Sequence, residues 1–431
     1  LKAMVRNKEK RSSRYVRLFH GFEIFAVAGD LHFYVNQMML KQTYPHLQIR
    51  LPQLIAGILI FFSTAALQAQ VYNLDNEKIQ LGEKKNLLCW MELSPDGKTL
   101  SISSTQGYPL FQFDWQSKSL SNTYTVNDWY AGSRLNYSPD GSKILLQHLY
   151  YADYKPNEDR EVEFQVVDAK NGTELFKINN AHDVRFMPDG KHLLSLEGDH
   201  LNVIEISSGK KVDRHKFYNA SVSATIDPAG KLIAVAVHPD DKEALENIPS
   251  LRQDRKALKK ALEYKQMIEI LDAETYETKY TVQDLFDLIF RVEFSADGRF
   301  LLVLHTPHTK TASSVSAKQS YVSVVDMSNG EVLRTIFLST SDFEPQFRLH
   351  PNGTIFGIET KGRKFREIHL YDFASGDLLE RYELSYRLLE TLRAGEFVGD
   401  GRNCFEFLPD NSVIIVTGNR LQIWKPDCLN N

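Results

Sequence analysis

The chain has 431 residues, of which 42% are hydrophobic and 25% are charged, a composition typical of a globular protein with a sizeable core. This balance excludes a disordered chain. The formal net charge is −4, from 51 basic and 55 acidic side chains, so no overall field favours nucleic acid or an anionic membrane. We therefore expect no nucleic-acid partner.

The first 37 residues show neither helical nor strand periodicity, and the chain begins with Leu1. We interpret residues 1–37 as a non-native extension, translated from upstream of the natural start. Met38 or Met39 is the better initiator.

Residues 38–69 have the pattern of a signal peptide. The basic residues Lys41 and Arg50 precede an apolar run over 51–62, and small and polar residues follow up to a cleavage site after Ala69. An uncleaved membrane anchor is the alternative, although the apolar run is near the lower limit for crossing a bilayer. We predict an exported protein, periplasmic or secreted, without a transmembrane segment after cleavage.

The rest of the chain, residues 70–431, carries a turn motif seven times. In each copy Pro presets φ, Asp or Asn bonds to the local backbone, and Gly accepts a positive φ, which together favour a tight hairpin turn. The copies are Ser94-Pro-Asp-Gly97, Ser138-Pro-Asp-Gly141, Met187-Pro-Asp-Gly190, Asp227-Pro-Ala-Gly230, Ser295-Ala-Asp-Gly298, His350-Pro-Asn-Gly353 and Leu408-Pro-Asp-Asn411.

Each motif is followed by a short apolar or alternating run, such as 231–237 or 412–417, which predicts a strand. A second turn signal comes later in each unit, an acidic residue followed by Gly four positions on, as in Asp168 to Gly172 and Asp326 to Gly330. Each unit is therefore predicted to be a four-stranded antiparallel sheet. Such sheets bury both faces only by stacking, and radial stacking gives an all-β, seven-bladed β-propeller.

With its seven repeats the sequence resembles the WD40 and YVTN families of seven-bladed propellers over roughly residues 71–428. It lacks the Gly-His pair in most blades, and the Trp-Asp pair survives only as Trp424-Lys425. These families share no catalytic motif, so the resemblance implies a fold and no reaction. After Trp424 there is no room for a fourth strand, so we expect the N-terminal segment 71–81 to supply it and close the ring.

Loop lengths indicate one functional face. Blades two, four and five carry insertions between their second and third strands, and the connection within Ser385–Arg402 is also long. In a propeller these connections emerge on the face opposite the tight turns. Because binding residues concentrate on long loops of rigid scaffolds, we take this long-loop face as the functional surface.

Two groups of residues on that face are candidates for binding. The aromatic side chains Trp129, Tyr130, Tyr150, Tyr151 and Tyr154 could stack a sugar or anchor a peptide, or could instead pack between blades. The blade-four insertion has leucines near helical spacing, at Leu251, Leu258 and Leu262, which predicts a short amphipathic helix. Its basic residues, among them Arg252 and Arg255, could meet an anionic partner or form a solvated surface.

The residues His238, Asp240, His305 and His308 are the only candidates for a metal or acid–base site, because the strand ends that carry them share one rim. Ordinary surface polarity is the alternative for all four. No phosphate loop, zinc-protease motif, nucleophile elbow or EF-hand loop occurs, so we predict no cofactor and identify no catalytic residue.

The three cysteines form no C-x-x-C pair. Cys89 and Cys404 are expected on the innermost strands of the first and last blades. Their offsets from the following turn differ by one residue, which points them to opposite faces of their strands, so separate thiols are expected.

Three functions remain open. The first is an exported, non-catalytic propeller that binds a protein, peptide or glycan through the long-loop face. The second is a propeller-fold enzyme, of hydrolase or lactonase type, with a site at the mouth of the channel. The third is a structural part of an envelope assembly, which leaves monomer or assembly component as the two expected states.

Overall fold

The structure is a computed structural model that describes residues 79–82, 88–104, 109–126, 129, 132–148, 162–216, 220–239, 241–308, 320–338, 346–361, 365–387, 405–417 and 420–430. The chain divides into two compact units, residues 1–71 and 72–431. The predicted extension, signal peptide and cleavage site all lie outside the described residues. Everything below concerns the second unit.

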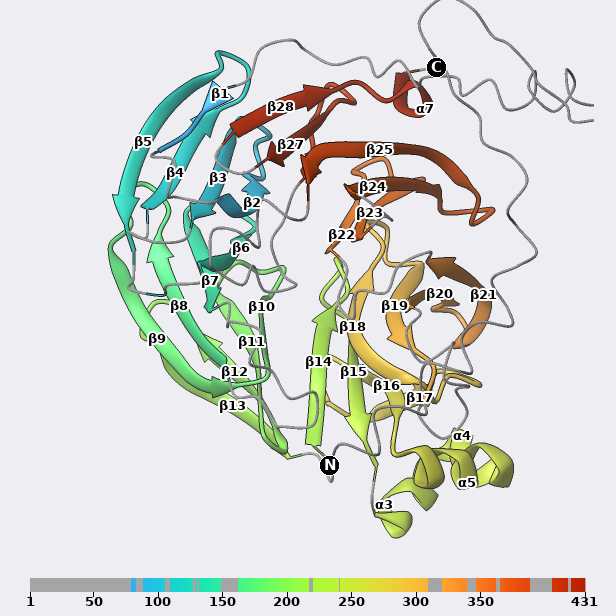
Figure 1. The fold of residues 1–431 in the computed structure, drawn as a ribbon. Coiled ribbons are helices and arrows are strands. Elements are labelled where there is room, and N and C mark those ends of the chain that lie inside the picture. The colour runs from blue at the N-terminus through green and yellow to red at the C-terminus, as the bar shows by residue number, and fades with distance from the viewer. Residues whose placement is uncertain are drawn as a thin grey trace, which may run out of the picture. The chain divides into compact units, whose positions relative to one another are not determined.

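The second unit is a seven-bladed β-propeller in which every blade is a four-stranded antiparallel sheet (Figure 1). Blades one to three contain β2 (Leu88–Leu93), β3 (Thr99–Ser104), β4 (Pro109–Asp114) and β5 (Ser119–Thr125); β6 (Ser133–Tyr137), β7 (Lys143–His148), β8 (Val162–Asp168) and β9 (Glu174–Ala181); and β10 (Asp183–Phe186), β11 (His192–Glu197), β12 (His200–Glu205) and β13 (Lys210–Lys216). Blades four to six contain β14 (Ala220–Ile226), β15 (Leu232–His238), β16 (Met267–Asp272) and β17 (Thr278–Thr281); β18 (Leu288–Phe294), β19 (Phe300–Thr306), β20 (Ser320–Asp326) and β21 (Glu331–Leu338); and β22 (Gln346–Leu349), β23 (Ile355–Lys361), β24 (Phe365–Asp372) and β25 (Leu378–Arg387). Blade seven joins β1 (Ile79–Gln80) to β26 (Phe405–Phe407), β27 (Val413–Thr417) and β28 (Arg420–Trp424).

The ring closes as predicted from the sequence. β1 is the outer strand of blade seven, where Ile79 pairs with Leu421 and Gln80 with Arg420. The two ends of the domain thus share one sheet, and separating them requires breaking that sheet. The N-terminal strand thus supplies the fourth, outer strand that the C-terminal segment of blade seven lacks.

The seven predicted turns all join the first and second strands of a blade. In blade one, the Gly97 amide donates to the Ser94 carbonyl over 2.8 Å, and Ser94 Oγ bonds Asp96 Oδ1 over 2.6 Å. The seventh turn has Asn411 in place of Gly, and Asn411 takes the same left-handed conformation with φ 62°. Asn is among the few residues that tolerate this region, so the degenerate copy keeps the geometry of the other six.

The core consists of apolar layers between neighbouring blades. Between blades four and five, for example, Ala234 and Ile270 of one blade pack with Val303 and Val325 of the next. The second and third strands of the blades, such as β3, β15 and β19, are buried almost throughout, because both faces of a blade pack against neighbouring blades. A hydrogen bond on the outer rim repeats between blades: Tyr124 Oη donates to the Ala169 carbonyl, and Tyr280 Oη to the Met327 carbonyl.

The described helices lie outside the blades. The blade-four insertion forms α3 (Lys242–Glu246), α4 (Pro249–Gln253) and α5 (Arg255–Tyr264), and α7 (Asp427–Asn430) follows the last strand. Figure 1 shows α3, α4 and α5 gathered at one side of blade four. None of the helices in the described ranges is long and apolar enough to cross a bilayer.

Candidate functional site

The long insertions fall where the sequence placed them. In blades two, four and five the gap between the second and third strands runs from His148 to Val162, from His238 to Met267 and from Thr306 to Ser320. The insertion of blade four is described almost completely, whereas those of blades two and five lie largely outside the described residues. The described part of the candidate site therefore consists of residues from blade four, its helical insertion and blade five.

The helical insertion is fixed by capping at both of its main helices. Asp241 caps α3 by accepting from the amides of Glu243 and Ala244, and Asp254 caps α5 by accepting from those of Lys256 and Ala257. Capping side chains of this kind typically contribute about 1 kcal/mol each. The insertion is therefore a set of short, well-defined helices rather than an irregular loop.

The apolar side of the insertion packs on blade four, but the single amphipathic helix predicted from the leucines is two helices, with Leu251 in α4 and Leu258 and Leu262 in α5. Leu251, Leu258 and Ala261 are buried against the blade together with Val237 and Met267. Leu262, the third predicted leucine, is partly buried against the same cluster. The predicted basic residues Arg252 and Arg255 are exposed on the outer side. Whether they bind a partner stays a prediction.

A recess of about 400 Å³ opens between blades four and five on the long-loop side. One wall is the connection from β17 to β18, with Asp284, Leu285 and Asp287, and the other belongs to blade five. The residues from blade five are His305, Pro307, Tyr321, Val332 and Thr335. A volume of this size suits a small ligand or one or two side chains of a peptide.

The rings of His305 and Tyr321 form part of the blade-five lining of the recess, and Phe337 adjoins Tyr321 just outside that lining. Tyr321 stacks on His305 with ring centroids 5.6 Å apart, and Phe337 meets the edge of Tyr321 at the same separation. Phe337 is 49% exposed although it is large and apolar. An exposed aromatic ring beside a hollow provides a contact surface for a ligand, with little loss of side-chain entropy on binding.

A chain of hydrogen bonds runs through the floor of the recess. Asp287 Oδ2 contacts His305 Nδ1 over 2.9 Å, and His305 Nε2 contacts Ser323 Oγ over 2.8 Å. Ser323 Oγ then bonds Thr335 Oγ1 over 2.8 Å. The connectivity is that of an acid–histidine–serine triad. However, the Ser323 side chain is fully buried, at 0% exposure, so a substrate does not reach its oxygen in this conformation.

The predicted metal candidates have other partners in the structure. His305 is part of the chain above, His308 lies edge-on to Tyr264 at 5.1 Å, and His238 Nδ1 is near the Lys265 carbonyl at 3.0 Å. Asp240 lies outside the described residues. In the part of the chain that the structure describes, no three His, Cys, Asp or Glu side chains gather as metal ligands.

Among the predicted aromatic binders, only Trp129 is described; Tyr130, Tyr150, Tyr151 and Tyr154 lie outside the described residues. Trp129 is 4% exposed, stacks on His148 at 4.8 Å and donates through Nε1 to Glu163 Oε2 over 3.2 Å. In this conformation Trp129 packs within the core layer between blades one and two. The role of the four tyrosines stays a prediction.

The cysteines are only partly described. Cys89 is buried, and Ser103 Oγ lies 3.6 Å from its sulfur. Cys428 is half-buried, and its burial, together with the nearby Glu380 carboxylate, raises the pKa of the thiol to about 12. Cys404 lies outside the described residues, so the expectation of separate thiols at Cys89 and Cys404 stays a prediction.

The central channel contains a cluster of charged residues that the sequence analysis did not identify. Its members stand two or four positions before the tight turns, on the innermost strands. Ion pairs join them across blades: Arg185 Nη1 lies 3.2 Å from Glu293 Oε1, linking blade three to blade five. We call this set the channel cluster; it comprises Glu92, Arg134, Asp183, Arg185, Arg291, Glu293, Arg348 and Glu406.

Arg348 joins three blades within the channel cluster. Its guanidinium lies 3.0 Å from Glu92 Oε2 and 3.1 Å from Glu406 Oε2, and it donates to the Met91 carbonyl over 2.6 Å. It also stands over the Trp90 ring, with 4.7 Å to the centroid. Only 8% of Arg348 is exposed. Two carboxylates therefore depend on one buried cation.

The protonation of the channel cluster follows from this crowding. Burial raises the pKa of Glu406 to about 7, with Arg348 opposing the rise and Glu92 adding to it. Burial also raises the pKa of Glu92. Glu293 is buried as well, but the nearby guanidinium groups of Arg291 and Arg185 hold its pKa down, at about 2. The three carboxylates thus differ because their numbers of arginine partners differ.

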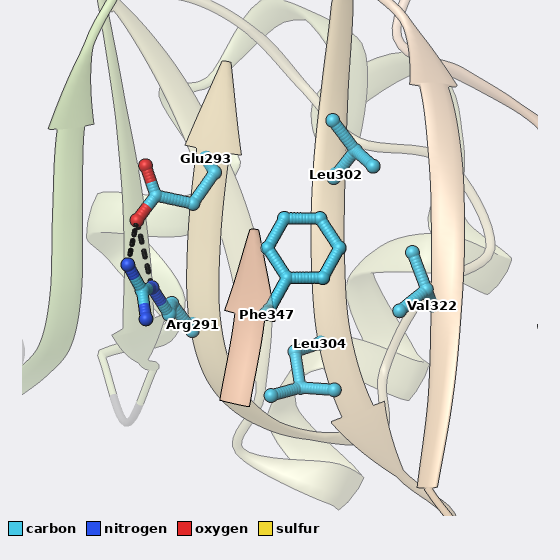
Figure 2. A pocket seen from close by; sticks show the side chains of 6 residues that line it. All are labelled: Arg291, Glu293, Leu302, Leu304, Val322 and Phe347. Atoms are coloured by element: carbon cyan, nitrogen blue, oxygen red, sulfur yellow. Dashed lines mark hydrogen bonds and ion pairs between the residues drawn. The ribbon is translucent and has the colours of Figure 1, made fainter. Parts of the chain in front are cut away.

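A small cavity of about 10 Å³ lies beside the channel cluster. Figure 2 shows the Arg291–Glu293 ion pair on one side of it and the apolar side chains of Leu302, Val322 and Phe347 on the other. The volume is at the lower limit for one water molecule. It leaves no room for a ligand, so the recess is the better candidate for a binding site.

No protein-family model matches this chain, and no curated protein sequence matches it. The fold and the geometry of the recess therefore carry the functional argument.

Proposed function

We propose that the protein is an exported, non-catalytic binding or scaffold propeller of the WD40-like or YVTN-like kind. It holds a protein, peptide or glycan at the long-loop face of blades four and five. The observation that carries this proposal is the recess of about 400 Å³ beside the half-exposed Phe337 ring. Large apolar side chains exposed beside a hollow are typical of a contact surface.

The walls of the recess support binding rather than catalysis. Asp284 is paired with Lys260 over 3.0 Å, and Asp287 is bonded to His305, so both carboxylates already have partners within the protein. The one hydroxyl in a triad-like position, on Ser323, is fully buried. A wall whose polar groups are mutually satisfied is preorganised and costs little to order when a ligand binds.

The runner-up is an enzyme of hydrolase or lactonase type on the same scaffold. The hydrogen-bonded order Asp287–His305–Ser323 favours it, because that order matches the roles of acid, base and nucleophile. Such activity would require blade five to move until Ser323 Oγ reaches the recess. A part in an envelope assembly is a form of the first proposal, with a neighbouring protein as the ligand.

Site-specific photo-crosslinking tests the proposed function. Phe337 is replaced by the photoreactive benzoylphenylalanine, which keeps an aromatic ring at the recess, and the protein is crosslinked in the cells that produce it. The control carries the same probe at Lys170, an exposed residue in the turn between β8 and β9 of blade two. We expect a discrete adduct from position 337 and none of the same mass from position 170. Identical products from both positions, or no adduct from position 337, would contradict the proposal.

A further inference from the structure

We propose that the exposed face of α4 and α5 docks an acidic peptide segment of a partner protein. An apolar side chain of that segment enters the recess between blades four and five. This inference rests on the proposed function and adds the chemistry of the partner. The acidic residues of the segment contact what we call the basic face, which comprises Arg252, Arg255, Lys256 and Lys259.

The charges of the basic face are available to a partner. All four side chains are exposed, and no described carboxylate lies within ion-pair distance of any of them. Lys260 differs from them, because its ammonium is paired with Asp284. Asp254, the one acidic residue between Arg252 and Lys260, is occupied in capping α5. Four like charges without an ion-pair partner among the described residues attract an anionic group.

The basic face continues to the rim of the recess. Lys256 and Lys260 stand four residues apart on α5, so they are neighbours on one side of the helix, roughly 5–6 Å apart at their Cβ atoms. The Lys260 ammonium bonds Asp284 and stands over the Phe286 ring at 5.5 Å. Since Asp284 lines the recess, a single extended segment can reach both the basic face and the hollow.

The recess favours a segment that also carries an apolar residue. Leu285, Pro307 and Val332 make part of its lining apolar, and Tyr321 adds an aromatic ring. Burying one leucine-sized side chain stabilises a complex more than an exposed ion pair does. The apolar residue therefore supplies affinity, and the charges select the partner and speed the encounter.

A membrane surface fits the helices less well than a peptide does. A helix that lies in a bilayer interface inserts its apolar side into the lipid. Here Leu251, Leu258 and Ala261, which form that side, are buried against blade four. The outer side offers charge alone, over less than three helical turns. Because the exposed side of α4 and α5 is short, it matches a short acidic peptide segment better than a long polyanion.

The test uses the full-length protein and a fluorescent peptide in which one leucine is flanked by glutamates, Glu-Glu-Leu-Glu-Glu. Binding is followed by fluorescence anisotropy at low salt. The test variant carries Lys256→Glu and Lys259→Glu together. The control variant carries Lys170→Glu and Lys210→Glu, which change the net charge by the same amount at exposed positions outside the basic face. Glutamate is favourable near the N-terminus of α5, so the first variant should fold.

We expect the acidic peptide to bind the native protein and the control variant with equal affinity. The Lys256→Glu, Lys259→Glu variant should bind at least tenfold more weakly, a loss of about 1.4 kcal/mol or more. Replacing the peptide leucine by glycine should also weaken binding. A peptide of opposite charge, Lys-Lys-Leu-Lys-Lys, should bind more weakly than the acidic peptide.

Three results would overturn the inference. They are equal binding of the acidic peptide to both double variants, absence of binding to the native protein, and binding only to phosphatidylcholine vesicles that contain phosphatidylglycerol. Photo-crosslinking from position 337 distinguishes failure of this inference from failure of the proposed function. If the adduct still forms in the Lys256→Glu, Lys259→Glu variant, the recess binds a partner but the basic face does not select it.

Discussion

Replacing Arg348 by methionine should destabilise the propeller strongly and in a pH-dependent way. Methionine keeps much of the side-chain length but removes the charge and the donors. Glu92 and Glu406 would then lose the cation that both of them contact, at 3.0 and 3.1 Å. The Met91 carbonyl would lose a donor at 2.6 Å, and the Trp90 ring a stacked cation.

The expected magnitude follows from the burial of these groups. Removing one partner of a buried ion pair typically costs about 3–5 kcal/mol, because the other partner remains buried without compensation. The Trp90 contact contributes a further ~1 kcal/mol. At pH 8 the loss should therefore be at least 3 kcal/mol. At pH 5 it should be smaller, because both carboxylates have raised pKa values and can take up protons in the variant.

The assay is urea unfolding followed by tryptophan fluorescence at both pH values, with Arg299→Met as the matched control. Arg299 also pairs with a carboxylate, Asp297 at 2.5 Å, but its side chain is 74% exposed. Exposed pairs contribute at most about 1 kcal/mol, so the control should be nearly neutral. If Arg348→Met lost no more stability than Arg299→Met at pH 8, the account of the channel cluster would be wrong.

Three further predictions follow from particular residues. Glu406→Gln should reduce the loss of native stability that occurs between about pH 4.5 and pH 7, as measured by urea unfolding across that range. The sign follows from the pKa of Glu406, which is about 7 in the folded protein and 4.5 in the unfolded chain. Between these pH values the folded state keeps a proton that the unfolded state has lost. The free energy of unfolding of the native protein therefore falls as the pH rises from 4.5 to 7. Gly172→Ala should lower the thermal midpoint more than Gly190→Ala. Both glycines have positive φ, but an added Cβ at position 172 would lie 2.1 Å from the Tyr124 ring, whereas one at position 190 would have nothing within 4 Å. Equal shifts of the midpoint would show that backbone strain alone matters. A fluorophosphonate probe should leave Ser323 unlabelled in mass spectra of the folded protein, and labelling there would favour the hydrolase.

The sequence predicted the fold because its turn chemistry is local. Each tight turn needs a residue that tolerates positive φ, and that demand is visible in seven tetrapeptides without knowledge of the tertiary structure. The loss of glycine from the second turn in blades one and four did not prevent the turn, since Lys118 and Tyr276 adopt φ of 53° and 59° there. Tertiary packing thus overrides local preference in degenerate copies.

The candidate site was harder to predict because it depends on contacts between blades. The sequence placed His305 on the correct rim but paired it with His308 and His238, whereas its partners are Asp287 and Ser323, which precede and follow it by 18 residues. The channel cluster was missed for the same reason. Arg185 and Glu293 stand at equivalent positions before their turns, which is a usable signal, but only ring closure brings them within 3.2 Å.

The most direct test of the recess as the binding site is amide hydrogen exchange of the protein with and without its crosslinked partner. Residues 282–287 and strands β20 and β21 should exchange more slowly in the complex, because they form the two walls of the recess. The tight turns on the opposite face should exchange at unchanged rates. Protection confined to those turns, with none in the recess walls, would contradict the account.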